Sequence, residues 1–135
     1  MSGQKPIAVV LAFLEAINSG DADKVCALMT EDHLFVDALG NEVRGRESMR
    51  KAWTGYFRWF PDYRVSHEEI LSQGEVVAAF GSAQGTYAKN GNITKENHWS
   101  APAAWKAVVR DGLVKEWRVY ADNQAARKIM GGPNP

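Results

Sequence analysis

The hydrophobic pattern of the chain changes character near residue 63. Before this point apolar residues recur every three or four positions, as on one face of a helix, and after it they alternate, as on a strand. The first part therefore predicts helices and the second a sheet. The expected elements are helices over 6–18, 21–29 and 46–59, a brief strand at 34–36, and long strands at 63–71, 75–88, 93–110 and 113–121.

Turn signals separate the long strands. Asp111-Gly112 is a strong hairpin dipeptide, and Gln73-Gly74 and Asn90-Gly91-Asn92 mark two further turns. Short turns join antiparallel neighbours, so the strands form a meander with the helices on one face. We expect an α+β fold in one domain spanning 1–135, with a flexible tail at about 130–135 and Asp122 capping a helix.

Alternation assigns the faces of the last two strands. In the last strand Leu113, Trp117, Val119 and Ala121 share the side expected to face the helices. In the strand before it, one side holds His98, Ser100, Pro102 and Ala104, and the other holds Trp99, Ala101, Ala103 and Trp105. A single bulge would invert every assignment beyond it.

Charge and composition exclude several classes of protein. Sixteen basic and sixteen acidic residues cancel, so the chain lacks the charge footprint of a protein that binds nucleic acid or an anionic membrane. The longest apolar run, Ile7 to Leu14, is too short to span a bilayer. The single cysteine, Cys26, excludes an intrachain disulfide and suits a reducing compartment. We expect a cytoplasmic protein.

Aromatic residues are numerous, with five Trp, four Tyr and five Phe. They indicate either a bulky core or a cavity with aromatic walls. The three histidines, His33, His67 and His98, lack the paired spacing of metal ligands, and we expect no metal and no cofactor.

Asp37 is the most informative residue. It closes the apolar run Leu34–Val36 and precedes the turn-like Leu39-Gly40-Asn41. One interpretation is a solvated turn acid. The other is a carboxylate facing an apolar cavity, which could remove a proton next to a carbonyl or activate a water. His98 is the best candidate for a second catalytic residue, since a neutral imidazole could donate to a developing enolate or relay a proton.

Several short segments, in this order, resemble the SnoaL-like family. The segments are Asn18–Asp21, Ala27–Asp32, Phe35–Asp37, Gly45–Glu47, Phe60–Arg64 and Asp111–Trp117. The family belongs to the NTF2-like superfamily, together with ketosteroid isomerase and limonene-epoxide hydrolase, and the resemblance extends from about Ile7 to Ile129. It implies a cystatin-like cone: three N-terminal helices on a strongly curved antiparallel sheet, with an apolar pocket between them.

The resemblance also implies a function. Members are commonly homodimers joined through the outer sheet face, SnoaL-like polyketide cyclases perform aldol chemistry, and isomerase relatives move protons next to a ketone. Asp37 falls at the isomerase's catalytic base. Phe13, Trp53 and the segment 102–105 fall where it carries two tyrosines and a second aspartate, so its donor set for the substrate oxygen is lost.

These observations lead to one expectation and one alternative. We expect a cofactor-independent cyclase- or isomerase-type enzyme acting on an apolar, carbonyl-bearing small molecule. The alternative is a non-catalytic ligand-binding or dimerisation module in which Asp37 is only a turn residue. Water addition to an epoxide would need more polar groups around the pocket than the sequence places there. The site residues expected are Asp37 and His98 for catalysis, and Phe13, Trp53, Tyr56, Phe57, Trp105 and Trp117 for substrate binding.

Overall fold

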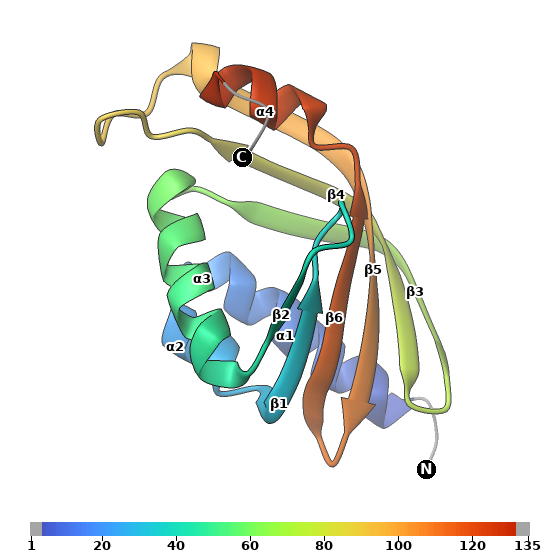
Figure 1. The fold of residues 1–135 in the computed structure, drawn as a ribbon. Coiled ribbons are helices and arrows are strands. Elements are labelled where there is room, and N and C mark those ends of the chain that lie inside the picture. The colour runs from blue at the N-terminus through green and yellow to red at the C-terminus, as the bar shows by residue number, and fades with distance from the viewer. Residues whose placement is uncertain (1–3, 132–135) are drawn as a thin grey trace.

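A computed structural model describes residues 4–131 and shows the α+β cone that the sequence predicts (Figure 1). A six-stranded sheet curls around the helices without closing into a barrel. The elements are α1 (Gln4–Ser19), α2 (Ala22–Cys26), β1 (Met29–Val36), β2 (Glu42–Arg44), α3 (Arg46–Trp59), β3 (Arg64–Gln73), β4 (Val76–Thr86), a 3-10 turn (Lys95–Asn97), β5 (His98–Arg110), β6 (Leu113–Ala121) and α4 (Gln124–Met130).

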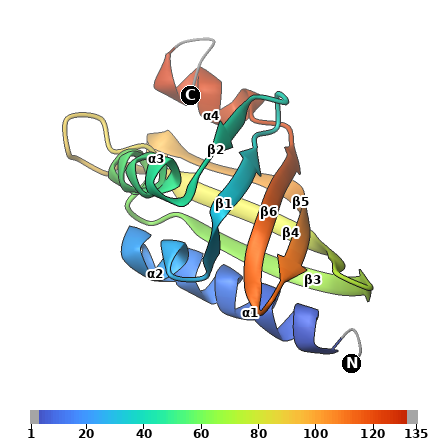
Figure 2. The ribbon, with the colours of Figure 1, turned by 60° about the horizontal axis from the view of Figure 1, so that its bottom comes forward.

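The strand order is β2-β1-β6-β5-β4-β3, and every neighbouring pair is antiparallel except β1 with β6. Helix α1 runs across the concave face over β3 to β6, whereas α3 packs beside β1 and β2 (Figure 2). The concave face between these two helices is the place where a cavity can form. No helix within residues 4–131 is long and apolar enough to cross a membrane.

Helix α3 has the predicted bounds, and α1 is slightly longer than predicted. The second helix was predicted to reach Met29, but it ends at Cys26, because Met29 opens β1 and pairs with Val114 of β6. The strand predicted at 34–36 is accordingly eight residues long. The exposed residues Glu31 and Asp32 lie within it and hide its start from the hydrophobic pattern.

The strand predicted at 93–110 begins only at His98, and residues 87–97 form a loop that contains the 3-10 turn. Strand β2 and helix α4 were not predicted, being three and seven residues long. The N-cap residue of α4 is Asn123 and not Asp122 as expected, although Asp122 Oδ1 accepts the N–H of Gln124, the first residue of the helix, at 2.9 Å. Of the predicted tail, Met130 ends α4 and Gly131 caps it, while residues 132–135 lie outside the described residues.

The faces of β5 agree with the alternation: Trp99 and Trp105 are buried, and His98 is exposed on the opposite side. In β6 the expectation for Leu113 is wrong. The pairing with β5 shifts between Val108 and Val109, which leaves an extra residue in β6 before Glu116. The shift turns Val114 fully into the core and Leu113 away from it.

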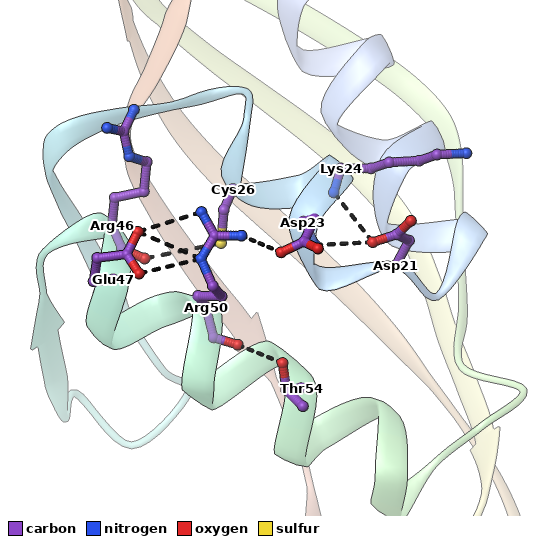
Figure 3. Close-up of polar contacts among 8 residues, drawn as sticks. All are labelled: Asp21, Asp23, Lys24, Cys26, Arg46, Glu47, Arg50 and Thr54. Atoms are coloured by element: carbon purple, nitrogen blue, oxygen red, sulfur yellow. Dashed lines mark hydrogen bonds and ion pairs between the residues drawn. The ribbon is translucent and has the colours of Figure 1, made fainter.

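Polar contacts fasten α2 to α3 (Figure 3). Asp21 caps α2 by accepting the N–H of Asp23 at 2.9 Å. Arg50 of α3 is hydrogen-bonded to Asp23 of α2 and to Glu47 of its own helix. Beneath them Cys26 is fully buried, and burial raises the pKa of its thiol. It is a packing residue with a protonated thiol at neutral pH.

His33 is a buried titratable group in β1. Its ring is fully buried, Nδ1 lies 2.7 Å from the Val114 carbonyl oxygen, and Nε2 has no partner among the described residues. Nδ1–H therefore donates to Val114. Burial lowers the pKa of His33, although the hydrogen bond to Val114 opposes this shift. The folded protein holds this imidazole neutral.

We expect this histidine to make the protein sensitive to mild acid. Below the unfolded-state pKa of roughly 6.5 the unfolded chain takes up a proton that the folded chain refuses, so the free energy of unfolding falls by up to about 1.4 kcal/mol per pH unit. Urea unfolding between about pH 7 and pH 5 measures this slope. His33→Gln should flatten it and His67→Gln, at an exposed position, should not; equal slopes in all three proteins would contradict the prediction.

Candidate ligand-binding cavity

A cavity of about 310 Å³ lies on the concave side of the sheet, lined by α3, by the turn after β1 and by α4. This volume suits a small organic molecule. All five tryptophans of the chain line it: Trp53, Trp59, Trp99, Trp105 and Trp117. The aromatic richness of the sequence therefore reflects a cavity wall as well as a core.

The cavity exists because small and large side chains face one another across it. Trp105 and Trp117, from neighbouring strands, stack with ring centroids 6.2 Å apart and form part of the floor. Beside them β4 and β5 also contribute the short side chains of Ala83, Ala101 and Ala103, which leave space in front of the sheet. Side chains normally close such gaps, so an unfilled apolar space of this size favours a ligand.

Another wall of the cavity is a chain of ring contacts. Trp53 and Tyr56, one turn apart on α3, have ring centroids 5.9 Å apart. Tyr56 meets Tyr63 edge to face at 4.9 Å, and Tyr63 lies 6.1 Å from Trp99. Together these four residues, here called the donor wall, line the cavity and carry two hydroxyl and two indole N–H groups.

The two tyrosines of the donor wall are neutral phenols. Burial raises the pKa of Tyr56 well above its ordinary value and that of Tyr63 to about 12. The neighbouring Tyr63 raises the pKa of Tyr56 further. Both side chains retain some accessible surface, and they line the cavity. As neutral phenols, both can donate a hydrogen bond to a ligand.

Asp37 follows β1 at the edge of the cavity and is half-buried. Its Oδ1 accepts the backbone N–H groups of Leu39 and Asn41, both at 2.9 Å, and its Oδ2 accepts Asn41 Nδ2 at 3.2 Å. Asp37 thus closes the turn and lines the cavity at once. Oδ2, with one side-chain partner, is the oxygen better able to receive a ligand proton.

The structure does not bring His98 to Asp37, which corrects the predicted pairing. Because Trp99 faces inward, His98 faces outward. Its Nδ1 lies 2.9 Å from the Thr86 hydroxyl, which lies 2.6 Å from Asp62 Oδ2. A carboxylate only accepts, so Thr86 donates to Asp62 and His98 donates to Thr86. This network lies outside the cavity lining.

Two of the residues predicted to bind substrate, Phe13 and Phe57, lie outside the cavity lining. Phe13 is fully buried against Trp117, at 4.7 Å, and Phe57 stacks on Trp53 at 5.2 Å. Neither lines the cavity, because each packs behind a tryptophan that does. Trp53, Tyr56, Trp105 and Trp117 do line it, and their role in binding stays a prediction.

Sequence reasoning missed Tyr63 and Trp99 as cavity residues. Alternation placed Trp99 on the same face as Trp105, which was expected to bind substrate, and that signal was sufficient to nominate Trp99 as well. Tyr63 lies between α3 and β3, where no periodic pattern applies. Within residues 4–131, no group of three or more His, Cys, Asp and Glu side chains could hold a metal ion.

Known structures share this architecture. A protein from Jannaschia sp. CCS1, assigned as a SnoaL-like polyketide cyclase, matches with a TM-score of 0.81 and 19% identity over 98% of this chain and 97% of its own. IdmH from Streptomyces antibioticus, assigned as a polyketide cyclase, matches with a TM-score of 0.75 and 24% identity over 93% and 98%. A hypothetical protein with a ketosteroid isomerase-like fold from Catenulispora acidiphila DSM 44928, in complex with trimethylamine, matches with a TM-score of 0.78 and 19% identity over 93% of each chain.

These identities establish the fold alone, and no curated protein matches the sequence. The family is shown by the sequence itself. The profile of the SnoaL-like domain matches residues 10–117, which include the greater part of α1, the turn that holds Asp37, α3, β3 to β5 and the first half of β6. The chain therefore belongs to the SnoaL-like family.

Proposed function

We propose that the protein binds a neutral, apolar, carbonyl-bearing small molecule in this cavity and transfers a proton at the carbon next to the carbonyl, with Asp37 as the base. One observation carries the proposal. Among the residues that line the cavity, Asp37 is the sole charged side chain, and the others are aromatic, aliphatic or uncharged polar groups. Such a site needs no cofactor to move a proton.

The charge of the cavity supports a neutral ligand. An anion would lie near Asp37 with no lining lysine, arginine or histidine to offset the repulsion. An apolar ketone avoids this repulsion. Its hydrocarbon part contacts the aromatic walls, and the weakly acidic C–H groups next to its carbonyl can face the Asp37 carboxylate. Membership of a family whose structural relatives are assigned as polyketide cyclases agrees with a carbonyl-rich substrate.

Proton exchange tests the reaction without knowledge of the natural substrate. Removal of an α-proton from 1-tetralone by Asp37 gives the enolate, and return of a deuteron from D₂O restores the ketone with one C–H replaced by C–D. We expect the protein to accelerate this exchange, followed by proton NMR, above the rate in buffer. Ala101→Phe, which fills the cavity, should abolish the acceleration. Binding without acceleration would favour the non-catalytic alternative.

The aromatic walls favour a second candidate, an organic cation. A carboxylate beside several Trp and Tyr rings can hold an alkylammonium group by charge and by cation–π contacts. The complex of the Catenulispora acidiphila protein with trimethylamine is consistent with this option. Tighter binding of tetramethylammonium than of 1-tetralone would select it over the carbonyl ligand.

We also propose that two copies associate through the outer sheet face. Phe80, Ala104 and Tyr120 lie side by side across β4, β5 and β6, and both aromatic side chains are exposed. Such an apolar centre suits a self-complementary interface. Light scattering at micromolar concentration should give a dimer mass. Phe80→Glu should give a monomer, and Ile93→Glu, in the exposed loop, should leave the dimer; a monomeric unmodified protein would contradict the proposal.

A further inference from the structure

Four buried side-chain polar atoms lack a hydrogen-bond partner within the described part of the chain: Thr30 Oγ1, His33 Nε2, Trp53 Nε1 and Trp99 Nε1. Unpaired buried donors are rare, because each gives up its bonds to water without replacement. Thr30 and His33 do not line the cavity. Trp53 and Trp99 both do, and both are indole N–H donors that can only be satisfied by an acceptor.

The two indoles come from different elements but end in one wall. Trp53 projects from α3 with 6% of its surface exposed, and Trp99 from β5 with 5% exposed. The ring contacts through Tyr56 and Tyr63 connect them. The wall thus carries the unpaired indole N–H groups of Trp53 and Trp99 together with the hydroxyl of Tyr63.

The wall offers no charge and few acceptors, so it is matched to an oxygen atom that only accepts. A carbonyl oxygen is such an atom, and its acceptor strength grows as an enolate forms. Asp37 follows β1, whereas Trp99 opens β5, and β6 separates these two strands. A ligand can therefore direct its oxygen to one part of the cavity while a C–H group faces the other. In this structure both indole Nε1 atoms are buried, so contact with a ligand oxygen requires the indole rings to turn toward the ligand.

We infer that the donor wall is the oxygen-binding subsite of the cavity, with Trp99, Trp53 and Tyr63 donating to the ligand's carbonyl oxygen. This inference rests on the proposed function and deepens it. Indole and phenol donors then occupy the role that Phe13 and the segment 102–105 leave vacant in this chain. The apolar remainder of the ligand lies against the alanines and the Trp105–Trp117 floor.

Two ligands of nearly the same shape distinguish the contribution of the donor wall to binding from that of the rest of the cavity. Tetralin is 1-tetralone without its oxygen, and tryptophan fluorescence reports the binding of each, since every tryptophan lines the cavity. A substitution that alters only the packing around the ligand changes both dissociation constants alike. Their ratio therefore reports the hydrogen bonds made to the ketone oxygen. We expect the preference for the ketone to fall about 5- to 10-fold in Trp99→Phe and in Tyr63→Phe, the effect of one lost hydrogen bond. Trp59→Phe, which alters a lining tryptophan that is 42% exposed and so is not a buried unpaired donor, should keep the preference of the unmodified protein.

Nitrogen-15 NMR of the indole N–H groups gives an independent readout in the unmodified protein. The ketone should move the Trp53 and Trp99 indole protons downfield, and tetralin should not. Three results would contradict the oxygen-binding role of the donor wall while both ligands still bind in the cavity. They are an unchanged ratio of dissociation constants in Trp99→Phe and Tyr63→Phe, an equal fall of that ratio in Trp59→Phe, and the absence of a downfield shift. Failure of both ligands to bind would overturn the proposed function as well.

Discussion

Asp37→Asn should reduce enzyme-catalysed proton exchange of 1-tetralone by about 10²- to 10⁴-fold, the range of a lost general base. The dissociation constant of the ketone should change by less than about threefold. Asparagine has the shape of aspartate, and its carbonyl oxygen can still accept the N–H groups of Leu39 and Asn41 that close the turn. The substitution therefore removes the proton acceptor and keeps the cavity edge.

A matched variant separates the base from the turn. Asn41→Ala removes the side-chain contact to Oδ2 but leaves the carboxylate, so exchange should fall by no more than about tenfold. The measurement is the exchange rate by NMR, with ketone affinity determined on the same samples. If Asp37→Asn keeps the full rate, Asp37 is only a turn residue. If both variants lose the rate equally, the turn geometry and not the base is responsible.

Gly81→Ala should lower the free energy of unfolding by about 2–4 kcal/mol, at or above the upper end of overpacking effects. A Cβ atom at Gly81 would lie 1.9 Å from the Ser66 carbonyl oxygen and 2.8 Å from His67 Cα. Both are main-chain atoms of β3, next to the place where the β3–β4 pairing shifts register. No side-chain rotation relieves this contact, so the two strands must separate.

Gly55→Ala is the matched control. Gly55 lies within α3, and an added methyl group there meets nothing within 4 Å. Since glycine is a poor helix former, alanine should raise the free energy of unfolding by about 0.5–1 kcal/mol. Urea denaturation followed by circular dichroism measures both variants. A Gly81→Ala protein as stable as the unmodified one would show that β3 and β4 do not approach this closely.

The parts of the fold that followed from the sequence are those with strong local signals. The aromatic stripe of α3 and Pro61 after it fixed that helix, and Asp111-Gly112 fixed the β5–β6 hairpin. Alternation correctly placed Trp99 and Trp105 on one face of β5, and both are buried. By contrast, the start of β1 depends on its pairing with β6, a contact between residues far apart in the chain, and no local pattern reveals it.

The candidate site was predicted only in part, because being apolar or aromatic does not decide which layer a side chain occupies. Phe13 and Phe57 pack behind Trp117 and Trp53, and periodicity cannot distinguish a wall from its support. His98 was assigned to the right face of β5, but that face is the outer one. Whether an indole N–H group is paired depends on contacts between elements far apart in the chain, so no local pattern reveals that those of Trp53 and Trp99 are unpaired.

The most direct test of the account is the charge preference of the cavity. Tryptophan fluorescence titration at about pH 7 compares three small probes: neutral 1-tetralone, anionic 1-naphthoate and cationic tetramethylammonium. With Asp37 as the sole charged lining residue and neutral donors in the wall, the ketone should saturate one site per chain, and the carboxylate should bind at least about tenfold more weakly. Equal or tighter binding of the carboxylate, tighter binding of the cation, or saturation by none of the three would contradict a site for neutral carbonyl compounds.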